Sequence, residues 1–137
     1  MTEHPIDLTP LQRAIDRLGE GWERYQRDTN DIQIRDGLIQ RFEFTYELSH
    51  KMLKRVLERN APSTETFDTM SFADLIRNGN EHGLLLGTWV EWKQYREMRS
   101  RTSHSYDEDV ALQVVSGIPA FISEARFLVG RLAAYRS

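Results

Sequence analysis

A short polar stretch, "RSRTSHSYDED" at residues 99–109, contains the side chains of this sequence that are best suited to chemistry. Its histidine, His104, can give and take a proton near neutral pH. Arg99 lies five residues earlier, and an arginine fork can hold a phosphate and stabilise charge that develops on it. Tyr106 adds a phenolic hydroxyl. These groups suit cleavage of a phosphodiester, and in RNA the substrate's own 2′-hydroxyl can attack the adjacent phosphorus without a metal or a protein nucleophile.

Basic residues lead into this stretch. The segment "KQYREMRSR" (93–101) carries four cations and one acid, whereas the whole chain has a formal net charge of −3. Arginine outnumbers lysine in the chain, and arginine contacts phosphate in a planar, bidentate way. The competing interpretation is a solvated helix face, in which the arginine and histidine only cap the preceding helix. The candidates for supporting roles or RNA contacts are Arg96, Ser100, Arg101 and Ser103.

The composition narrows the function classes. A chain of 137 residues fits one domain with a hydrophobic core. It contains no cysteine, which excludes disulfides, thiolate zinc sites and thiol catalysis. The sequence has no plausible cluster of metal ligands, so we expect no metal and no cofactor. No apolar run approaches the length of a membrane span and the N-terminus lacks a signal pattern, so we expect a soluble cytoplasmic protein without membrane contact.

Helical periodicity accounts for most of the chain, and no alternating pattern typical of strands is present. The sequence predicts long helices over 9–27 and 32–59, a short helix over 72–77, and two further helices over 88–101 and 106–134. Glycine and asparagine in "NGNEHG" (78–83) are expected to end the short helix. The predicted fold is all-α: an up-and-down four-helix bundle with an additional short helix, in a single domain over residues 1–137.

Two capping boxes mark the predicted starts of the first and last long helices. Thr9 stands three residues before a glutamine, with a proline at the first helical position. Ser105 stands three residues before a glutamate. A helix that ends near residue 101 and another that is capped by Ser105 would enclose a tight turn, which can return His104 toward Arg99. Tyr106 would then be the first residue of the last helix.

Spacing alone does not make this pair specific, because Arg77 and His82 have the same separation in "RNGNEH". Longer strings are more specific. The strings "IQRFEFTYELSHKMLKRVLE" (39–58), "ADLIR" and "RSRTSHSYDE" (99–108) lie in the order and spacing of one family. Over residues 8–135 the chain resembles the small helical proteins known as nucleotidyltransferase substrate-binding subunits. These belong to the HEPN superfamily, which includes the toxins of HEPN/MNT toxin–antitoxin pairs.

The resemblance places the family's signature (arginine, four residues, histidine, one residue, tyrosine) on Arg99, His104 and Tyr106. It implies a homodimer in which two such motifs meet in a cleft and cut RNA, such as tRNA or mRNA, without a metal. Arg99 would bind or polarise the phosphate, and His104 would act as general acid and base. The implied partner is an MNT-type nucleotidyltransferase antitoxin, which in some family members transfers AMP to the motif tyrosine.

Two other functions stay open on the sequence. A non-catalytic substrate-binding subunit of a nucleotidyltransferase would form a tight complex without cutting RNA. A purely structural helical adaptor would need no chemistry at all. Ser100 gives weight to the binding subunit, because many relatives have an asparagine directly after the motif arginine and a serine side chain is shorter.

Several other side chains have both an ordinary and a functional interpretation. His50 stands where relatives commonly carry tryptophan, and we interpret it as a packing or interface residue. Glu43 and Glu47 could orient a cleft arginine, but the favoured interpretation is exposed acids paired with neighbouring basic residues. Trp89 and Trp92 could stack on bases, but tryptophans three apart in a helix favour a core or interface role.

Overall fold

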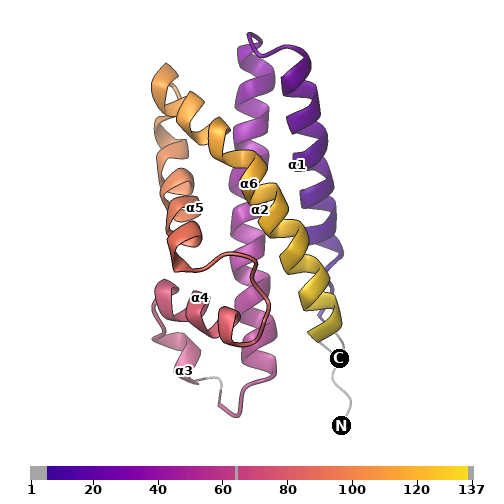
Figure 1. The fold of residues 1–137 in the computed structure, drawn as a ribbon, viewed down its shortest axis with the longest axis vertical. Helices are drawn as coiled ribbons and strands as arrows, with labels where there is room; N and C mark the ends of the chain where they lie inside the picture. The colour runs from indigo at the N-terminus through magenta and orange to yellow at the C-terminus, as the bar shows by residue number, and fades with distance from the viewer. Residues whose placement is uncertain (1–5, 64, 136–137) are drawn as a thin grey trace.

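The protein folds as a bundle of helices, and the predicted all-α class is confirmed (Figure 1). The computed structural model describes residues 6–63 and 65–135. The four main helices run alternately up and down, and two short helices connect the second to the third at one end of the bundle (Figure 1). The elements are α1 (Thr9–Arg27), α2 (Ile32–Arg59), α3 (Glu65–Asp68), α4 (Phe72–Glu81), α5 (Trp89–Arg101), the 3-10 helix η1 (Thr102–His104) and α6 (Glu108–Tyr135).

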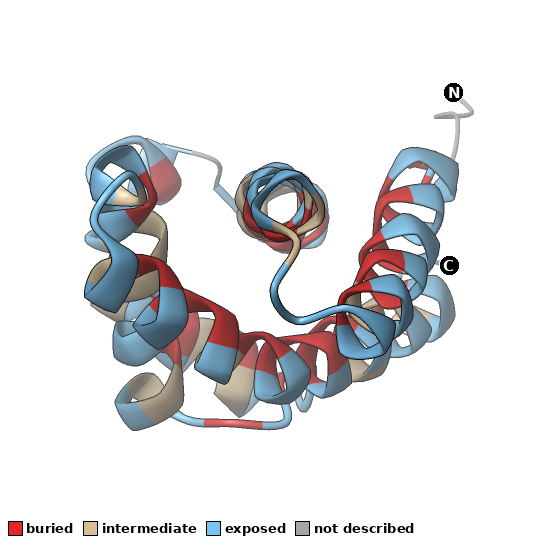
Figure 2. Ribbon diagram, turned by 90° about the horizontal axis from the view of Figure 1, so that it is seen from above, coloured by how far each residue is buried: buried red, intermediate tan, exposed pale blue. Residues whose placement is uncertain are grey.

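Helix α2 is the central element. Figure 2 looks along this helix and shows the other helices in a crescent around one side of it, with buried residues facing inward. Leu38, Phe42 and Leu53 of α2 are almost fully buried, because apolar positions three and four apart form one face of a helix. Two polar residues, Thr45 and Ser49, are also buried, and each hydroxyl donates to the carbonyl four residues earlier. The opposite side of α2 is left open by the crescent (Figure 2).

An aromatic cluster joins α2, α5 and α6. Trp92 and Phe121 are fully buried, and the Phe121 ring meets Phe42 edge to face at a centroid distance of 5.0 Å. Tyr95 meets the same Phe121 ring at 5.3 Å. Edge-to-face pairs at such distances are favourable beyond the area that they bury. The cluster fixes α5 against α2 and thereby sets the position of the arginine-rich end of α5.

The start of α1 differs from its predicted cap. The helix begins at Thr9, but Leu8 is the N-cap residue and no side chain caps the helix. The Thr9 backbone N–H instead donates to Asp7 Oδ1 at 3.0 Å. The predicted Thr9 capping box is therefore wrong, although the proline does lie in the first turn. An acid two residues upstream of Thr9 satisfies the free backbone donor, so the threonine hydroxyl is not needed for it.

The connection between α2 and α5 contains more helix than predicted. The expected loop over 60–69 includes α3, whose Phe67 is buried. Helix α4 continues through "NGNE" to Glu81, so these residues do not end it as expected. Gly79 is a close-packing residue there, since a Cβ at this position would lie 2.9 Å from Leu85. The left-handed residue is Gly83, with a φ of 70°, just beyond the helix.

Helix α6 is apolar and 28 residues long. By length and composition it meets the requirement for crossing a membrane, so the expectation that no segment would do so is wrong. Its large apolar residues Ile118, Phe121 and Leu128 are nevertheless fully buried, and the helix packs against α1, α2 and α5. A core helix of a soluble protein passes the same test of length and composition. Ile118, Phe121 and Leu128 belong to the hydrophobic core of the bundle.

A buried carboxylate fixes the loop that leads into α5. Glu124 of α6 accepts hydrogen bonds from the backbone N–H groups of Leu86 and Gly87, both at 2.8 Å. Burial raises the pKa of the Glu124 carboxyl, and the two backbone hydrogen bonds oppose that change. The next residue, Thr88, caps α5 in a capping box with Glu91. The start of α5 is thus tied to α6.

Candidate functional site

The predicted site lies where the chain leaves α5, passes through η1 and enters α6. The cap of α6 is Asp107, whose Oδ1 accepts from the Val110 backbone N–H at 3.1 Å. Ser105 and Tyr106 lie in the turn before the helix. The predicted Ser105 cap and the helical position of Tyr106 are therefore wrong. The reason is η1, a 3-10 turn that occupies three residues after α5 and moves the start of α6 along the chain.

An ion pair between helices holds this turn in place. Arg35 of α2 is buried, and its Nη1 lies 2.7 Å from Oε1 of Glu108, the first residue of α6. The hydrogen bond from Arg35 lowers the pKa of the Glu108 carboxyl. The end of the turn is therefore anchored to the central helix.

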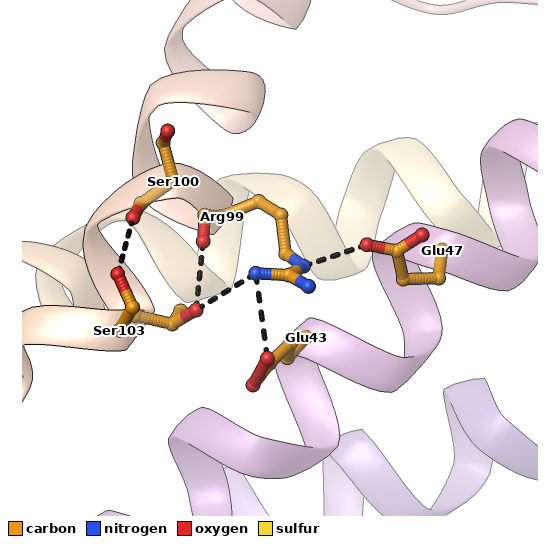
Figure 3. A network of polar contacts seen from close by, with 6 residues as sticks. Glu43, Glu47, Arg99, Ser100 and Ser103 are labelled. Atoms are coloured by element: carbon orange, nitrogen blue, oxygen red, sulfur yellow. Dashed lines mark hydrogen bonds and ion pairs between the residues drawn. The ribbon is translucent and has the colours of Figure 1, made fainter.

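Arg99 is held by two acids from α2 (Figure 3). Its Nε lies 2.7 Å from Glu47 Oε1, and its Nη1 lies 3.3 Å from Glu43 Oε1. Nη1 also donates to Thr102 Oγ1 at 3.2 Å, and the Thr102 hydroxyl donates to the Arg99 carbonyl at 2.7 Å. The guanidinium is thus fixed in orientation. Its second terminal nitrogen, Nη2, takes no part in these contacts and can donate to an oxyanion.

The two glutamates serve Arg99 rather than their neighbours in the sequence. Glu43 and Glu47 are four residues apart on α2 and therefore lie on one face of the helix. Arg99 reaches them from α5, a position 52 residues after Glu47. The interpretation of ordinary acids paired with nearby basic residues is wrong, and neighbouring Arg41 instead donates to the Arg17 carbonyl at 2.7 Å.

His104 and Tyr106 stand apart from this network. Both side chains are exposed, that of Tyr106 by 86%. Their ring centroids lie 6.2 Å apart in an edge-to-face arrangement. The polar contacts of the Arg99 side chain go to α2 and Thr102 rather than to His104. One chain therefore presents a proton-transfer group and a phenol to solvent, but it does not bring the arginine and the histidine into contact.

Three of the supporting candidates have structural partners. Arg101 turns toward α6, where its Nη1 donates to Gln113 Oε1 at 2.5 Å. The Ser103 hydroxyl donates to the Ser100 carbonyl at 3.1 Å, so this pair closes the end of the helix (Figure 3). Both serines and Arg101 are exposed, and none contacts the Arg99 guanidinium in the described part of the chain.

The fourth candidate, Arg96, lies over the ring of Phe72, with its guanidinium carbon 5.5 Å from the centroid. His50 and Trp89 meet the same ring edge to face at 4.7 Å and 5.7 Å. Both are half-buried, and burial lowers the pKa of His50. Trp92 is fully buried. His50 and the two tryptophans are thus packing residues, as predicted.

The chain matches known proteins over most of its length. A family model described as "Nucleotidyltransferase substrate binding protein like" matches residues 6–134. A Haemophilus influenzae protein named "Probable ribonuclease HepT" is 43% identical over 96 residues, which cover 70% of this chain and 65% of that relative. The match thus spans less than two thirds of the relative's length.

A solved structure from Haemophilus influenzae, described as the fold of a substrate binding domain of a nucleotidyltransferase, agrees with a TM-score of 0.87. It is 34% identical, and the match covers 93% of this chain and 99% of that chain. The fold, the helix order and these matches agree with the family to which the sequence resemblance points. The chain therefore belongs to the nucleotidyltransferase substrate binding protein-like family.

Proposed function

We propose that the protein is a toxin of the HEPN type, an endoribonuclease that cuts RNA without a metal. The observation that carries the proposal is the oriented arginine: Glu43 and Glu47 fix Arg99 through Nε and Nη1 and leave Nη2 to bind a phosphate, at the base of a turn that exposes His104. The name of the ribonuclease relative supports the same reaction class. We expect a single domain that acts in the cytoplasm.

In the proposed reaction the substrate supplies its own nucleophile. The 2′-oxygen forms a bond to the adjacent phosphorus while the bond from phosphorus to the 5′-oxygen breaks. One proton leaves the 2′-hydroxyl and one reaches the departing 5′-oxygen, and a histidine can carry out either transfer near neutral pH. Arg99 would hold the non-bridging oxygens and stabilise the charge that develops on them. The products are a 2′,3′-cyclic phosphate and a 5′-hydroxyl.

A homodimer would complete this site. The reaction needs a base at one oxygen and an acid at the other, and each chain contributes a single His104. Within one chain the Arg99 side chain is engaged by α2 and Thr102 rather than by His104. Two motifs that face each other across a cleft would supply two histidines and two oriented arginines to one phosphodiester.

The proposed partner is an MNT-type nucleotidyltransferase antitoxin, with Tyr106 as the acceptor of AMP. Its phenol is 86% exposed and lies two residues from His104. In the transfer, the phenolic oxygen forms a bond to the α-phosphorus of ATP, pyrophosphate leaves, and the phenolic proton passes to a base. The attached nucleotide would fill the space beside His104 and present its own phosphate to Arg99. Such a modification would block the binding of RNA.

The second candidate function is a non-catalytic binding subunit of a nucleotidyltransferase. The observation that favours it is the pairing of Arg99 with two carboxylates, which already offset its charge. The description of the solved relative as a substrate binding domain agrees with this function. It predicts a tight complex with the nucleotidyltransferase and no cleavage of RNA by the isolated chain.

The test is cleavage of purified tRNA and total RNA by the isolated protein in EDTA, with wild type beside His104→Ala. We expect cleavage that survives EDTA and is lost in the variant. Intact mass must first establish that Tyr106 carries no AMP, because a modified enzyme would be silent. Absence of cleavage by an unmodified, dimeric wild type would favour the binding subunit.

A further inference from the structure

An open groove runs along α2 away from Arg99. We propose that this groove binds the strand of RNA that flanks the cleaved phosphodiester, with Lys51, Lys54 and Arg96 contacting phosphates and Phe44 stacking on a base. The ligand class rests on the proposed function. What goes beyond that function is the path of the RNA strand, which extends from the turn after α5 onto the open side of α2.

The groove begins at the candidate site. It has a volume of about 490 Å³ and is lined by Phe44, Glu47, Leu48, His50, Lys51 and Lys54. These positions recur at three and four residues and therefore lie on one face of α2. Glu47 is also the carboxylate that binds Arg99, at 2.7 Å. At 1.5 Å per residue the distance along the helix from Glu47 to Lys54 is about 10 Å, which is more than a single phosphate requires.

Cations lie in this path and beside it. Lys51 is exposed, and Lys54 makes a long contact of 3.7 Å with Glu58. Arg96 does not line the groove itself; it is an exposed residue of α5, three residues before Arg99. Burial is the main cause of the lowered pKa of His50, and the nearby charges of Lys54 and Arg96 lower it further. Arg96 and His50 contact the same Phe72 ring, which places Arg96 beside the groove that His50 lines.

Arg96 is positioned before any ligand arrives. Its guanidinium lies over the Phe72 ring, with the guanidinium carbon 5.5 Å from the centroid, and His50 packs on the same ring at 4.7 Å. An arginine that stacks on an aromatic ring loses less side-chain freedom when it binds a phosphate. The acid that lines the groove, Glu47, is engaged in an ion pair with Arg99. The remaining cations are thus available for an anionic strand.

Phe44 gives the groove an apolar side. Its side chain is 60% exposed, which is unusual for phenylalanine. A basic groove with an exposed aromatic ring is the common arrangement for binding single-stranded nucleic acid, because every base has a face that can stack. A second copy of this chain is the competing occupant. Such a contact, however, would bring Lys51 and Lys54 of both copies into one interface, where like charges oppose association.

The experiment measures binding of a short single-stranded RNA with 2′-O-methyl groups, which cannot supply the nucleophile. Fluorescence anisotropy gives its Kd at several KCl concentrations for wild type and for Lys54→Gln/Arg96→Gln. Each phosphate contact on a single strand contributes about 0.7 to the slope of log affinity against log salt, so loss of two contacts lowers the slope by about 1.4. The charge-matched control is Arg24→Gln/Arg131→Gln, two exposed residues of α1 and α6 that do not line the groove.

Further variants separate charge from stacking. Lys54→Arg/Arg96→Lys keeps both charges and should restore most of the slope. Phe44→Leu should weaken binding about fivefold or more at every salt concentration and leave the slope unchanged, because it removes a stacked base and no charge. Circular dichroism and thermal unfolding establish that each variant is folded.

The outcomes distinguish this inference from the proposed function. If wild type binds the RNA analogue with the expected slope but cuts no RNA, the assignment of the groove as an RNA-binding site is supported and the nuclease proposal fails. The groove assignment is overturned if wild type does not bind, or if Lys54→Gln/Arg96→Gln binds with the affinity and slope of its control. It is also overturned if these substitutions change only the monomer–dimer equilibrium in sedimentation, since the groove would then be a contact between copies.

Discussion

At the scale of single residues, the central feature is the way that Arg99 is held. Its Nε and Nη1 serve three acceptors on two elements, namely Glu43, Glu47 and the Thr102 hydroxyl. A lysine at this position offers a single nitrogen and cannot reproduce this fork. The three contacts fix the plane of the guanidinium and therefore the direction in which Nη2 can donate.

We predict that Arg99→Lys lowers the rate of RNA cleavage by about 100-fold or more, the usual result of removing one oriented donor to a developing oxyanion. The half-exposed ion pairs contribute at most about 1 kcal/mol to the free energy of unfolding, so the variant should stay folded. Initial rates on a defined RNA and urea unfolding check the two parts. The control is Arg77→Lys in the similar pair on α4, which should keep the wild-type rate. Equal rates for both variants would contradict the role of Arg99.

Sequence reasoning could identify the motif residues but not their directions. Arg99, His104 and Tyr106 follow from the family signature. That Arg99 points toward α2 rather than toward His104 depends on how α5 packs on α2, which no local pattern encodes. The spacing of Glu43 and Glu47 predicts a shared face, and only the fold puts that face opposite α5. Thr102 was missed because a threonine three residues after an arginine is too common to indicate a site.

At the scale of helices and turns, two glutamates of α6 anchor the elements that carry the site. Glu108 pairs with buried Arg35 at the start of the helix. Glu124 accepts two backbone N–H groups from the loop before α5. Their pKa values change in opposite directions, raised for Glu124 by burial and lowered for Glu108 by the hydrogen bond from Arg35. Their contributions to stability should therefore respond to pH with opposite signs.

Glu124→Gln should reduce the free energy of unfolding at neutral pH by about 1 to 3 kcal/mol, because one buried N–H loses its acceptor. The raised pKa means that the folded protein binds this proton more tightly than the unfolded chain does. The contribution of this proton to the stability of the folded protein is fully present below the ordinary pKa of 4.5, and it is lost as pH rises through the raised value. The difference in the free energy of unfolding between wild type and Glu124→Gln, measured by urea unfolding, should thus widen as the pH falls from neutral toward 4.5. A gap that narrows over this range would contradict the assignment.

Glu108→Gln should behave in the opposite way. Its lowered pKa gives a contribution that is present above the ordinary value of 4.5 and is lost as pH falls through the folded-state value. We expect wild type to be more stable than Glu108→Gln at neutral pH and the two to converge in acid. The same urea series measures both variants, so each serves as the control for the other. A difference that is constant with pH would exclude the ion pair as its cause.

The bounds of the long helices α1 and α2 were predictable, whereas the caps of α1 and α6 were not. The period of apolar residues predicts α2 over 32–59, which are its observed bounds. Many residues contribute to such a pattern, so no single one decides it. A cap depends on one side chain, and nearby acids replaced the expected groups at both Thr9 and Ser105. Asp7 and Asp107 satisfied the free N–H groups instead.

At the scale of the whole molecule, α2 is covered on one side and open on the other (Figure 2). The bundle could be predicted because four amphipathic helices with short connections have few ways to bury their apolar faces. Which side of α2 stays open could not be predicted, because the residues on that side follow the same helical period as the buried ones. In the proposed function, a second chain and an RNA strand both approach the motif from outside this single bundle.

The proposed dimer predicts a mass in sedimentation equilibrium of twice the 16.1 kDa of one chain. Activity should fall on dilution into the range where the dimer dissociates, because each motif lacks its second histidine in the monomer. Mixing wild type with an excess of inactive His104→Ala protein should lower the activity per wild-type chain, because a mixed dimer contains a single His104. A monomer that is fully active would contradict the shared site.

The central claim is that the turn after α5 cuts RNA through the substrate's own 2′-hydroxyl, and one chemical measurement tests it directly. After mapping a cleaved phosphodiester, one would synthesise the same RNA with a single 2′-deoxyribose on the 5′ side of that bond and incubate both with wild-type protein in EDTA. The account predicts that the all-ribose RNA gives a 2′,3′-cyclic phosphate and that the deoxy position is not cut. Cleavage at the deoxy position would contradict it, because a different nucleophile would then have attacked the phosphorus.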